Sequence, residues 1–361
     1  MSAQNSQNDI SAQLQNKVSQ AFESGDILMI KAGGSKDFYG RSASISQPAT
    51  ELNISQHYGI ISYEPTELVI TARAGTPLKV IEQLLAENRQ MLAFEPPAFG
   101  KHATLGGTIA CNLSGPRRAY SGAARDYVLG TKIINGKAEI LSFGGTVMKN
   151  VAGYDVSRLM AGAMGTLGVI LEASIKVVPQ PETEITLVQT IDISSALNKL
   201  HQWSALPLPM SASCFYQDHL YIRLSGTEKS LRTAKQKIGG EILSEADAFW
   251  HSIKEQQHDF FNNKQTLWRL STASNTTPLT LADDTLYEWG GALRWFQSNQ
   301  SPSVIRESSE KTGHTTLFRS PAVRDEVFQT LPQPLLKLHQ NLKRSFDPHG
   351  VFNIGRLYPE F

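Results

Sequence analysis

Glycine is concentrated in one stretch of this chain, and that concentration limits what the chain can fold into more than any other feature. Of the 27 glycines in 361 residues, 13 lie between Gly100 and Gly168. Glycine has no Cβ atom, so backbone that is rich in it can turn sharply and approach a neighbouring segment or a ligand closely. All five tryptophans lie after residue 200. The contrast predicts a first part whose backbone approaches a ligand, and a second part with a conventional side-chain core.

The segment 177–183 carries two prolines and is the best linker between these parts. A chain of 361 residues is also longer than one hydrophobic core usually supports, which favours about two or three domains. We therefore expect a first domain over residues 1–180 and a second domain that begins at residue 181.

Hydrophobic spacing and proline placement predict the secondary structure of both parts. Before the linker, helices are expected over 9–24 and 77–88, and strands over 27–30, 68–72, 127–134, 138–143 and 167–178. After it we expect a strand over 185–191, a helix over 194–203, a hairpin of 211–215 and 220–224, and a helix over 228–238. This strand–helix–strand–strand–helix order is typical of an α+β layer.

Charge, cysteine content and hydropathy exclude several classes of protein. The 34 basic and 33 acidic residues leave a formal net charge of +1, too little to attract nucleic acid or an anionic membrane. Two cysteines, Cys111 and Cys214, can form neither a disulfide framework nor, alone, an iron–sulfur cluster. No apolar run reaches the roughly 18–20 residues that span a bilayer, and the N-terminus lacks a secretory pattern. We expect a cytoplasmic protein.

Motifs for several other chemistries are absent or incomplete. The sequence contains no phosphate-binding G-x-x-x-x-G-K-[ST], no G-x-S-x-G and no H-E-x-x-H. His251 and His258 could share one face of a helix, but because no third ligand lies nearby we expect no metal site. Cys111 has no adjacent base, which favours a packing role over that of a nucleophile.

Two glycine-bearing loops carry the strongest functional pattern. The first, residues 31–36, follows the first predicted strand directly, and its adjacent glycines leave backbone N–H groups free to form a nest for an anion. Ser35 adds a hydroxyl donor and Lys36 a charge. In the second, residues 103–115, Thr104 caps a short helical turn whose start would present N–H groups to a phosphate. Together they predict a diphosphate held from two sides; the alternative is two tight turns without a ligand.

The second loop and several later segments resemble a known family. Segments 104–115, 120–122, 125–130, 149–155 and 165–170 carry, in order, the pattern of the FAD-binding domain of the vanillyl-alcohol-oxidase/PCMH flavoprotein superfamily. The segment 346–356, FDPHGVFNIGR, resembles the one that returns to the flavin in the D-2-hydroxyacid dehydrogenase branch. Segments 95–100, 268–271, 290–295 and 313–319 are similar to the flavin subunits of glycolate oxidases.

This resemblance implies an α+β fold. A PCMH-type FAD-binding domain made of two α/β subdomains would occupy residues 1–180, and a ferredoxin-like α+β cap or substrate domain would occupy residues 181–332. Residues 333–361 would form a C-terminal segment that packs back on the FAD-binding domain.

The resemblance also implies which residues contact FAD. The first loop would hold one side of the diphosphate and the second loop the other, while later segments would line the adenine or the ring system. For the two asparagines in this set, a turn-forming role is the alternative. The implied residues are Gly33, Gly34, Ser35, Lys36, Pro96, Thr104, Gly106, Gly107, Asn112, Gly115, Gly153, Tyr154, Asp155, Gly165, Thr166, Gly168, Val169, Ile170 and Asn353.

Three departures from the family pattern bear on these contacts. The first loop has two glycines where many relatives carry three. It also lacks the histidine that covalent-flavin relatives place there, so we expect FAD to be held non-covalently. Met164 replaces the acidic residue that is usual in its motif, which removes one contact.

Oxidation of a 2-hydroxy acid needs a flavin, a base for the hydroxyl proton and a cation for the carboxylate. Candidates for the cation are Arg269, Arg294, Arg319 and Arg356, each of which could equally serve in a structural contact. His314 is the best candidate base by its motif setting, although a structural role is commoner for a lone histidine. The catalytic residues therefore stay open, with His314, Arg294 and Arg356 as candidates.

Three functions are compatible with the resemblance. The first is the FAD subunit of a multi-subunit glycolate oxidase or dehydrogenase, which would pass electrons to a second flavin subunit and an iron–sulfur subunit and contact the inner membrane only through them. The second is a self-sufficient FAD-dependent D-2-hydroxyacid dehydrogenase that acts on an acid such as D-lactate. The third is a structural subunit that holds flavin without catalysis. Turnover by the chain alone, turnover only with partners, or flavin that substrate never reduces would separate them.

Overall fold

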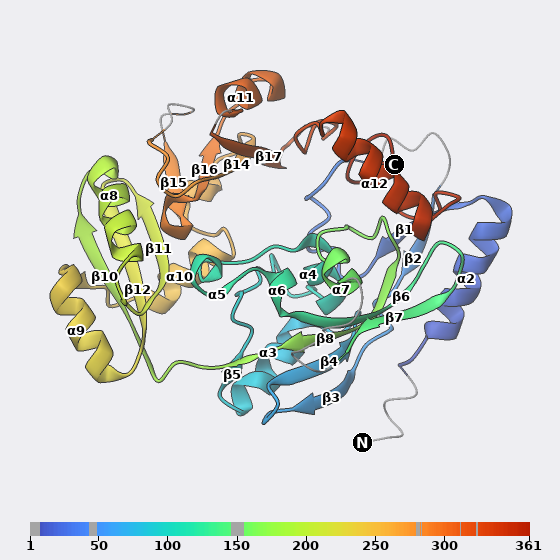
Figure 1. The fold of residues 1–361 in the computed structure, drawn as a ribbon, viewed down its shortest axis with the longest axis horizontal. Coiled ribbons are helices and arrows are strands. Elements are labelled where there is room, and N and C mark those ends of the chain that lie inside the picture. The colour runs from blue at the N-terminus through green and yellow to red at the C-terminus, as the bar shows by residue number, and fades with distance from the viewer. Residues whose placement is uncertain are drawn as a thin grey trace.

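The computed structural model describes residues 8–42, 49–145, 155–278, 282, 284–310, 312–322 and 324–361. These residues form two parts built on separate β-sheets, and the C-terminal helix returns to the first part (Figure 1). The second large sheet starts with β10, which begins at Thr183. The domain boundaries at residues 180 and 332 stay a prediction.

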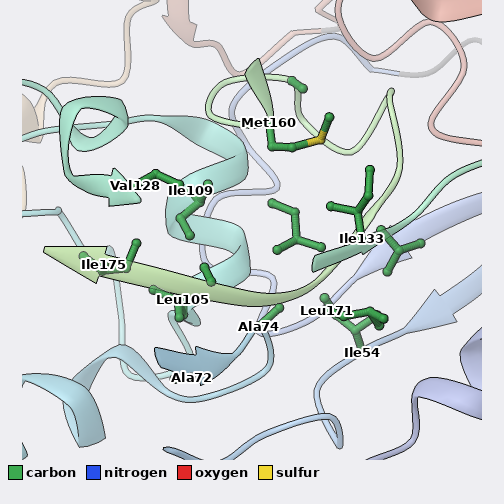
Figure 2. Close-up of a cluster of buried hydrophobic side chains, with 14 of the residues drawn as sticks. Ile54, Ala72, Ala74, Leu105, Ile109, Val128, Ile133, Met160, Leu171 and Ile175 are labelled. Carbon is green, nitrogen blue, oxygen red and sulfur yellow. The ribbon is translucent and has the colours of Figure 1, made fainter. Parts of the chain in front are cut away.

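The first part contains a five-stranded antiparallel sheet against which helix α4 (Leu105–Cys111) packs. Figure 2 shows Leu105 and Ile109 of this helix beside the strand that carries Ile175. Gly106 makes the close approach possible, because a Cβ atom there would lie 2.7 Å from the Cβ of Ala74. The strands, in spatial order, are β3 (Ile60–Glu64), β4 (Val69–Arg73), β8 (Val169–Lys176), β6 (Val128–Ile134) and β7 (Ile140–Gly144).

A second, two-stranded parallel sheet pairs β1 (Ile27–Lys31) with β2 (Ala49–Asn53), and helix α2 (Ser11–Ser24) leads into it. The C-terminal segment extends this sheet. The Leu28 N–H donates to the carbonyl of Val351 at 2.7 Å, and the Asn353 N–H donates to the carbonyl of Leu28 at 3.1 Å. The end of the chain is therefore part of the first domain's structure.

A buried ion pair fixes the C-terminal helix α12 (Gln333–Phe346). Lys343 Nζ lies 2.6 Å from Asp347 Oδ2 and also donates to the carbonyl oxygens of Thr166 and Phe352 at 2.7 and 2.9 Å. Asp347 in turn accepts two backbone N–H groups at 2.8 Å. Each buried charge thus has an opposite charge and further hydrogen-bond partners, which is the condition for keeping it buried.

The second part is built on an eight-stranded sheet whose first half has a ferredoxin-like order. The chain runs β10–α8–β11–β12–α9–β13, while the strands lie side by side as β13-β10-β12-β11. This half agrees with the elements expected over 185–238. The elements are β10 (Thr183–Thr190), α8 (Ile193–Ser204), β11 (Met210–Tyr216), β12 (His219–Gly226), α9 (Glu228–Ile238) and β13 (Glu241–Ile242).

The second half of this sheet was not predicted. Its strands continue the row as β15-β16-β14-β17 and carry polar residues such as Glu288, Arg294 and Thr315 on buried positions. These interrupt the apolar alternation by which a strand is recognised in a sequence. The strands are β14 (Leu267–Thr272), β15 (Thr285–Glu288), β16 (Leu293–Gln297) and β17 (Gly313–Arg319).

Shorter elements complete the described part of the chain. They are α3 (Leu78–Glu87), β5 (Gln90–Met91), α5 (Arg118–Ser121), α6 (Ala124–Tyr127), α7 (Val156–Leu159), β9 (Val178–Pro179), α10 (Ala246–Lys254), α11 (Pro302–Ser309) and the 3₁₀ turns η1 (Asp259–Asn262) and η2 (Trp289–Gly291).

Buried ion pairs join the two parts. Glu95 of the first part lies 3.3 Å from Arg117 of the same part and 2.8 Å from Arg223 of β12. Arg117 also contacts Glu184 of β10. Burial by itself would raise the pKa of Glu95, but the guanidinium groups of Arg223 and Arg117 hold that pKa below its usual range. Glu95 is therefore charged at neutral pH and links the first part to the second.

We expect Lys343→Met to lower the free energy of unfolding by about 3–5 kcal/mol, because it leaves the Asp347 carboxylate buried without a counter-charge. Arg344→Met is the matched control, since Arg344 is exposed one position away, and it should stay within about 0.5 kcal/mol of the parent. Urea unfolding of flavin-free protein, followed by circular dichroism, measures both. Equal effects of the two substitutions would contradict a structural role for the buried pair.

Candidate functional site

A cavity of about 290 Å³ lies between the two glycine-bearing loops. Both loops line it, although some seventy residues separate them in the sequence. The sequence-predicted residues in the lining are Gly33, Gly34, Ser35, Lys36, Thr104, Gly106, Gly107, Gly165, Gly168, Ile170 and Asn353.

The first loop lies directly against His102, the residue that precedes the second loop. A Cβ atom on Gly33 would lie 1.4 Å from the carbonyl oxygen of His102, so no other residue type fits there without moving one of the loops. Gly34 follows with a φ of +68°, a left-handed conformation that glycine adopts without strain. His102 also lines the cavity, and its carbonyl contact could not have been deduced from residue type.

The first loop offers unpaired backbone donors. Within the described part of the chain, no acceptor takes the backbone N–H groups of residues 33–36. Successive free N–H groups of this kind form a concave site for an anion. These free N–H groups support the anion nest, which stays a prediction.

The second loop differs from the expectation. The N–H groups of Leu105 and Gly106 donate to the carbonyls of Thr76 and Ala74 at 2.9 and 2.7 Å, and that of Gly107 donates to Thr104 Oγ1 at 3.3 Å. These amides are used to build the turn and to dock α4, so they are not free for a phosphate. What this loop presents to the cavity is the bare Cα of Gly107, where a Cβ atom would meet nothing closer than Thr104 Oγ1 at 3.3 Å.

Lys36 brings a buried positive charge to the cavity. The residue is 6% exposed, and its Nζ lies 3.5 Å from Ser35 Oγ and 3.4 Å from the carbonyl of Ala98. No carboxylate of the described residues lies within 4 Å of it. Burial lowers the pKa of this ammonium group, although distant charges such as Glu255 oppose the shift. A bound anion would supply the missing counter-charge.

The opposite wall combines the 164–170 segment with the C-terminal segment. Asn353 accepts the Ile30 N–H at 2.8 Å and donates to the carbonyl of Met164 at 2.7 Å, so it ties β1 to that wall. A Cβ atom on Gly165 would lie 2.6 Å from Asn353 Nδ2. Cys111 also lines the cavity, and burial raises the pKa of its thiol, which agrees with packing and not with a nucleophile.

Several implied FAD-binding residues lie elsewhere. Asn112 ends α4 with a φ of +51° and accepts the Arg125 N–H, so its turn-forming alternative describes it. Asp155 caps the start of α7, and Gly115 packs against the Glu95 carbonyl. Pro96, Thr166 and Val169 are buried outside the cavity lining, and Gly153 and Tyr154 lie outside the described residues.

The three catalytic candidates do not come together. Arg294 is 1% exposed and donates to the carbonyls of Gly291, Thr277 and Thr276, so its guanidinium holds a loop. Arg356 lines the cavity but donates to the carbonyls of Arg41, Asp37 and Tyr39. His314 is exposed on β17 and lines neither this cavity nor the neighbouring one.

Two other kinds of feature are absent from the described ranges. No group of three or more His, Cys, Asp or Glu side chains there could hold a metal ion. Among the helices of the same ranges, none combines the length and the apolar character needed to cross a bilayer.

Comparisons with known proteins agree with the cavity's chemistry. A family model described as an FAD binding domain matches residues 11–158. The chain is 45% identical over 353 residues to glycolate oxidase subunit GlcE of Escherichia coli strain K12, covering 98% of each chain. It is 34% identical over 137 residues to a D-lactate dehydrogenase of Anaerostipes hadrus, which is 38% of this chain and 28% of that protein.

Two further matches extend this picture. Glycolate oxidase subunit GlcD of Bacillus subtilis strain 168 is 37% identical over 130 residues, 36% of this chain and 27% of its own length. A solved alkyldihydroxyacetonephosphate synthase superposes with a TM-score of 0.68 at 13% identity, covering 94% of this chain and 73% of that one, which shows a shared fold. The expected PCMH-type fold is confirmed. The free amides and Lys36 fit the diphosphate of a group such as FAD.

We expect Lys36→Met to stabilise the flavin-free protein and to weaken FAD binding. The first effect follows from removing a buried charge that has no carboxylate partner, and the second from losing a charged donor, for about a 10- to 100-fold loss of affinity. Thermal unfolding and fluorescence titration with FAD measure the two effects. Lys101→Met, an exposed neighbour outside the lining, is the control, and a destabilised Lys36→Met protein with unchanged FAD affinity would refute the assignment.

We expect Gly107→Val to keep the fold and to lose FAD. The added Cβ atom meets only Thr104 Oγ1, at 3.3 Å, and this position lines the cavity, so the affinity for FAD should fall at least about tenfold. Cys111→Ser, a near-isosteric change at another lining position of α4, should keep the flavin. The flavin absorbance of the purified protein measures FAD content, and circular dichroism checks folding. A fully yellow Gly107→Val protein would contradict this role of the loop.

Proposed function

Because this chain belongs to the family of the FAD-binding glycolate oxidase subunit GlcE, among the vanillyl-alcohol-oxidase/PCMH flavoproteins, we propose that it holds FAD non-covalently as a subunit of a glycolate-oxidising complex. The chain is an FAD-dependent hydroxyacid oxidoreductase by this family membership. The observation that carries the proposal is full-length similarity combined with a cavity whose free amides and buried cation suit the cofactor's diphosphate.

In this proposal the first loop binds the diphosphate. The N–H groups of residues 33–36 donate to its oxygens, and Lys36 neutralises part of its charge. Gly107 leaves room for the cofactor on the other side, and Asn353 keeps the C-terminal wall in place. When bound, the flavin accepts a hydride equivalent from the carbon that bears the substrate's hydroxyl group.

The partners in this proposal are a second flavin subunit and an iron–sulfur subunit. Support comes from the names of two relatives, which are both subunits of glycolate oxidase. The two cysteines of this chain, Cys111 and Cys214, both lie in hydrophobic packing, so electrons would leave through a partner. We place the complex in the cytoplasm, with contact to the inner membrane only through the partners.

The alternative is a self-sufficient D-2-hydroxyacid dehydrogenase. It is favoured by the similarity to D-lactate dehydrogenases, which extends over 38% of this chain. Because most of the chain is unmatched in these comparisons, they support the alternative less than the full-length match supports the proposal.

One experiment tests the proposal. Acid precipitation of the purified protein should leave FAD in the supernatant, because the cofactor is not covalently attached. Glycolate added anaerobically should bleach the flavin absorbance of the complex reconstituted with its partner subunits. Flavin that stays with the precipitate would refute non-covalent binding. Bleaching by D-lactate with the isolated chain, and none by glycolate in the complex, would favour the alternative.

A further inference from the structure

A second cavity, of about 30 Å³, lies where the cap meets the first part. A cavity of this volume holds about two water molecules, so any molecule that enters it must be small. Its walls are mostly apolar, and one of them, Phe99, also approaches the FAD cavity, because its ring lies 5.9 Å from the Lys36 ammonium. A carboxyl group, Glu288, and a guanidinium group, Arg269, both face it.

Glu288 is a buried carboxyl group that the fold leaves without an ion-pair partner. It is 5% exposed, and its Oε2 accepts the Trp295 indole N–H at 2.7 Å. Within the described residues no lysine or arginine nitrogen lies within 4 Å of it, whereas Glu95 in the same interface has two arginines. Burial raises the pKa of Glu288 to about 7, with the Trp295 hydrogen bond and Arg269 opposing the shift.

Arg269 is a half-buried cation that lines the same cavity and also lacks an ion-pair partner among the described residues. Within the described ranges no carboxylate lies within 4 Å of it, and its guanidinium is 5.2 Å from the ring of Trp289. Trp289 is anchored to the first part by an indole N–H donated to the Gly115 carbonyl at 3.0 Å. Arg118 lies 4.3 Å from the same ring and adds positive charge. The site is thus electropositive apart from Glu288.

Trp289, which directly follows Glu288 in the chain, holds an unfavourable backbone conformation. Trp289 has a φ of +55°, which is unusual for a large side chain, and Gly290 and Gly291 follow at +67° and +91°. A Cβ atom on Gly291 would lie 2.4 Å from Leu197 Cδ2. The conformation of Trp289 costs about 1–3 kcal/mol and persists where the surroundings fix it, commonly at functional sites, whereas the two glycines adopt a positive φ without strain.

We propose that this small cavity is the substrate site, where Arg269 holds the carboxylate of a small 2-hydroxy acid and Glu288 takes the hydroxyl proton. This inference rests on the proposed function and adds to it the residues that bind and deprotonate the acid. The O–H bond breaks and its proton passes to the Glu288 carboxylate. The C–H bond of the same carbon breaks as its hydrogen leaves with both electrons to the flavin, and a C=O double bond forms.

The chemistry of the cavity suits this division of roles. A guanidinium binds a carboxylate through two parallel N–H donors, and a carboxyl whose pKa is near neutral can accept a proton at working pH. A purely structural Glu288 would explain the Trp295 hydrogen bond. It would leave the Arg269 guanidinium facing the same space with Tyr39 and the Trp289 ring beside it and no carboxylate within 4 Å among the described residues.

Several other charged or titratable groups face Glu288 from the elements packed around it. Their effects on its proton affinity have different signs: Arg269 favours the charged form and Glu95 the neutral form. The groups are Arg269 on β14, Glu95 after β5, Cys214 on β11 and, at the cavity wall, Lys254 of α10.

The test measures the anaerobic rate of flavin reduction by glycolate in the reconstituted complex between about pH 5.5 and 9. In the parent protein the rate should rise with pH and level off above about 7, because Glu288 must be unprotonated to accept the proton. Glu288→Gln keeps an acceptor for Trp295 but takes no proton. It should lower the rate about 10²–10⁴-fold and abolish the pH step, with the FAD content unchanged.

Further variants separate binding from proton transfer. Arg269→Met should raise the glycolate concentration needed for half-maximal rate at least about tenfold, with a smaller effect on the limiting rate. Trp295→Phe removes the hydrogen bond that favours the charged carboxylate, so the midpoint of the pH profile should move upward. Glu184→Gln, an interface carboxyl outside the cavity, is the matched control and should leave the profile unchanged.

A second measurement tests the titration of Glu288 without flavin. In the flavin-free chain the tryptophan fluorescence should show a step near pH 7 that Glu288→Gln removes, because Trp295 hydrogen-bonds the titrating carboxyl. If the parent complex is reduced normally and Glu288→Gln keeps both its rate and its pH step, this inference is overturned while the proposed function stands. If no 2-hydroxy acid reduces the parent flavin in any assembly, the proposed function fails, and the substrate role of Glu288 fails with it.

Discussion

The contact between Gly33 and the His102 carbonyl is the constraint on which the cofactor end of the molecule depends. It brings a loop after β1 against the loop before α4, and so closes a cavity between segments that are far apart in the chain. The same arrangement buries Lys36 where the described residues offer it only a hydroxyl and a carbonyl. A polypeptide that keeps a cation in this state gains stability from an anionic ligand, so binding and folding are linked at this loop.

The interface between the two parts holds two buried glutamates in opposite electrostatic states. Glu95 lies between Arg117 and Arg223 and is held charged, so it acts as a fixed joint between the parts. Glu288 has an indole N–H and a more distant arginine, and its proton affinity falls in the neutral range. The number of guanidinium groups at each carboxyl decides between the two states. The Glu95 carboxylate links the two parts of the fold, while the Glu288 carboxyl can gain or lose a proton near neutral pH.

Local pattern was enough for part of this structure. Helical spacing gave α2, and a proline marked the start of α3. Adjacent glycines after a strand predicted a loop with free backbone N–H groups, and residues 33–36 have them, while the anion nest itself stays a prediction. Elsewhere the sequence could not show which segments lie side by side. The first N–H groups of α4 donate to the carbonyls of Ala74 and Thr76, so they are not available as the donors that the second loop was expected to provide. Glu288 could not be predicted from the sequence. Its burial and its hydrogen bond with Trp295 exist only after folding.

The C-terminal wall has a consequence for how the protein matures. Asn353 closes the cavity by accepting the N–H of Ile30, a partner 323 positions earlier in the chain. During synthesis on the ribosome, the first loop emerges long before this wall exists. The side of the cavity that Asn353 closes therefore stays open until translation is nearly finished. If FAD binds there as proposed, cofactor loading is a late event, and a message truncated before codon 353 yields a product whose cavity lacks one side.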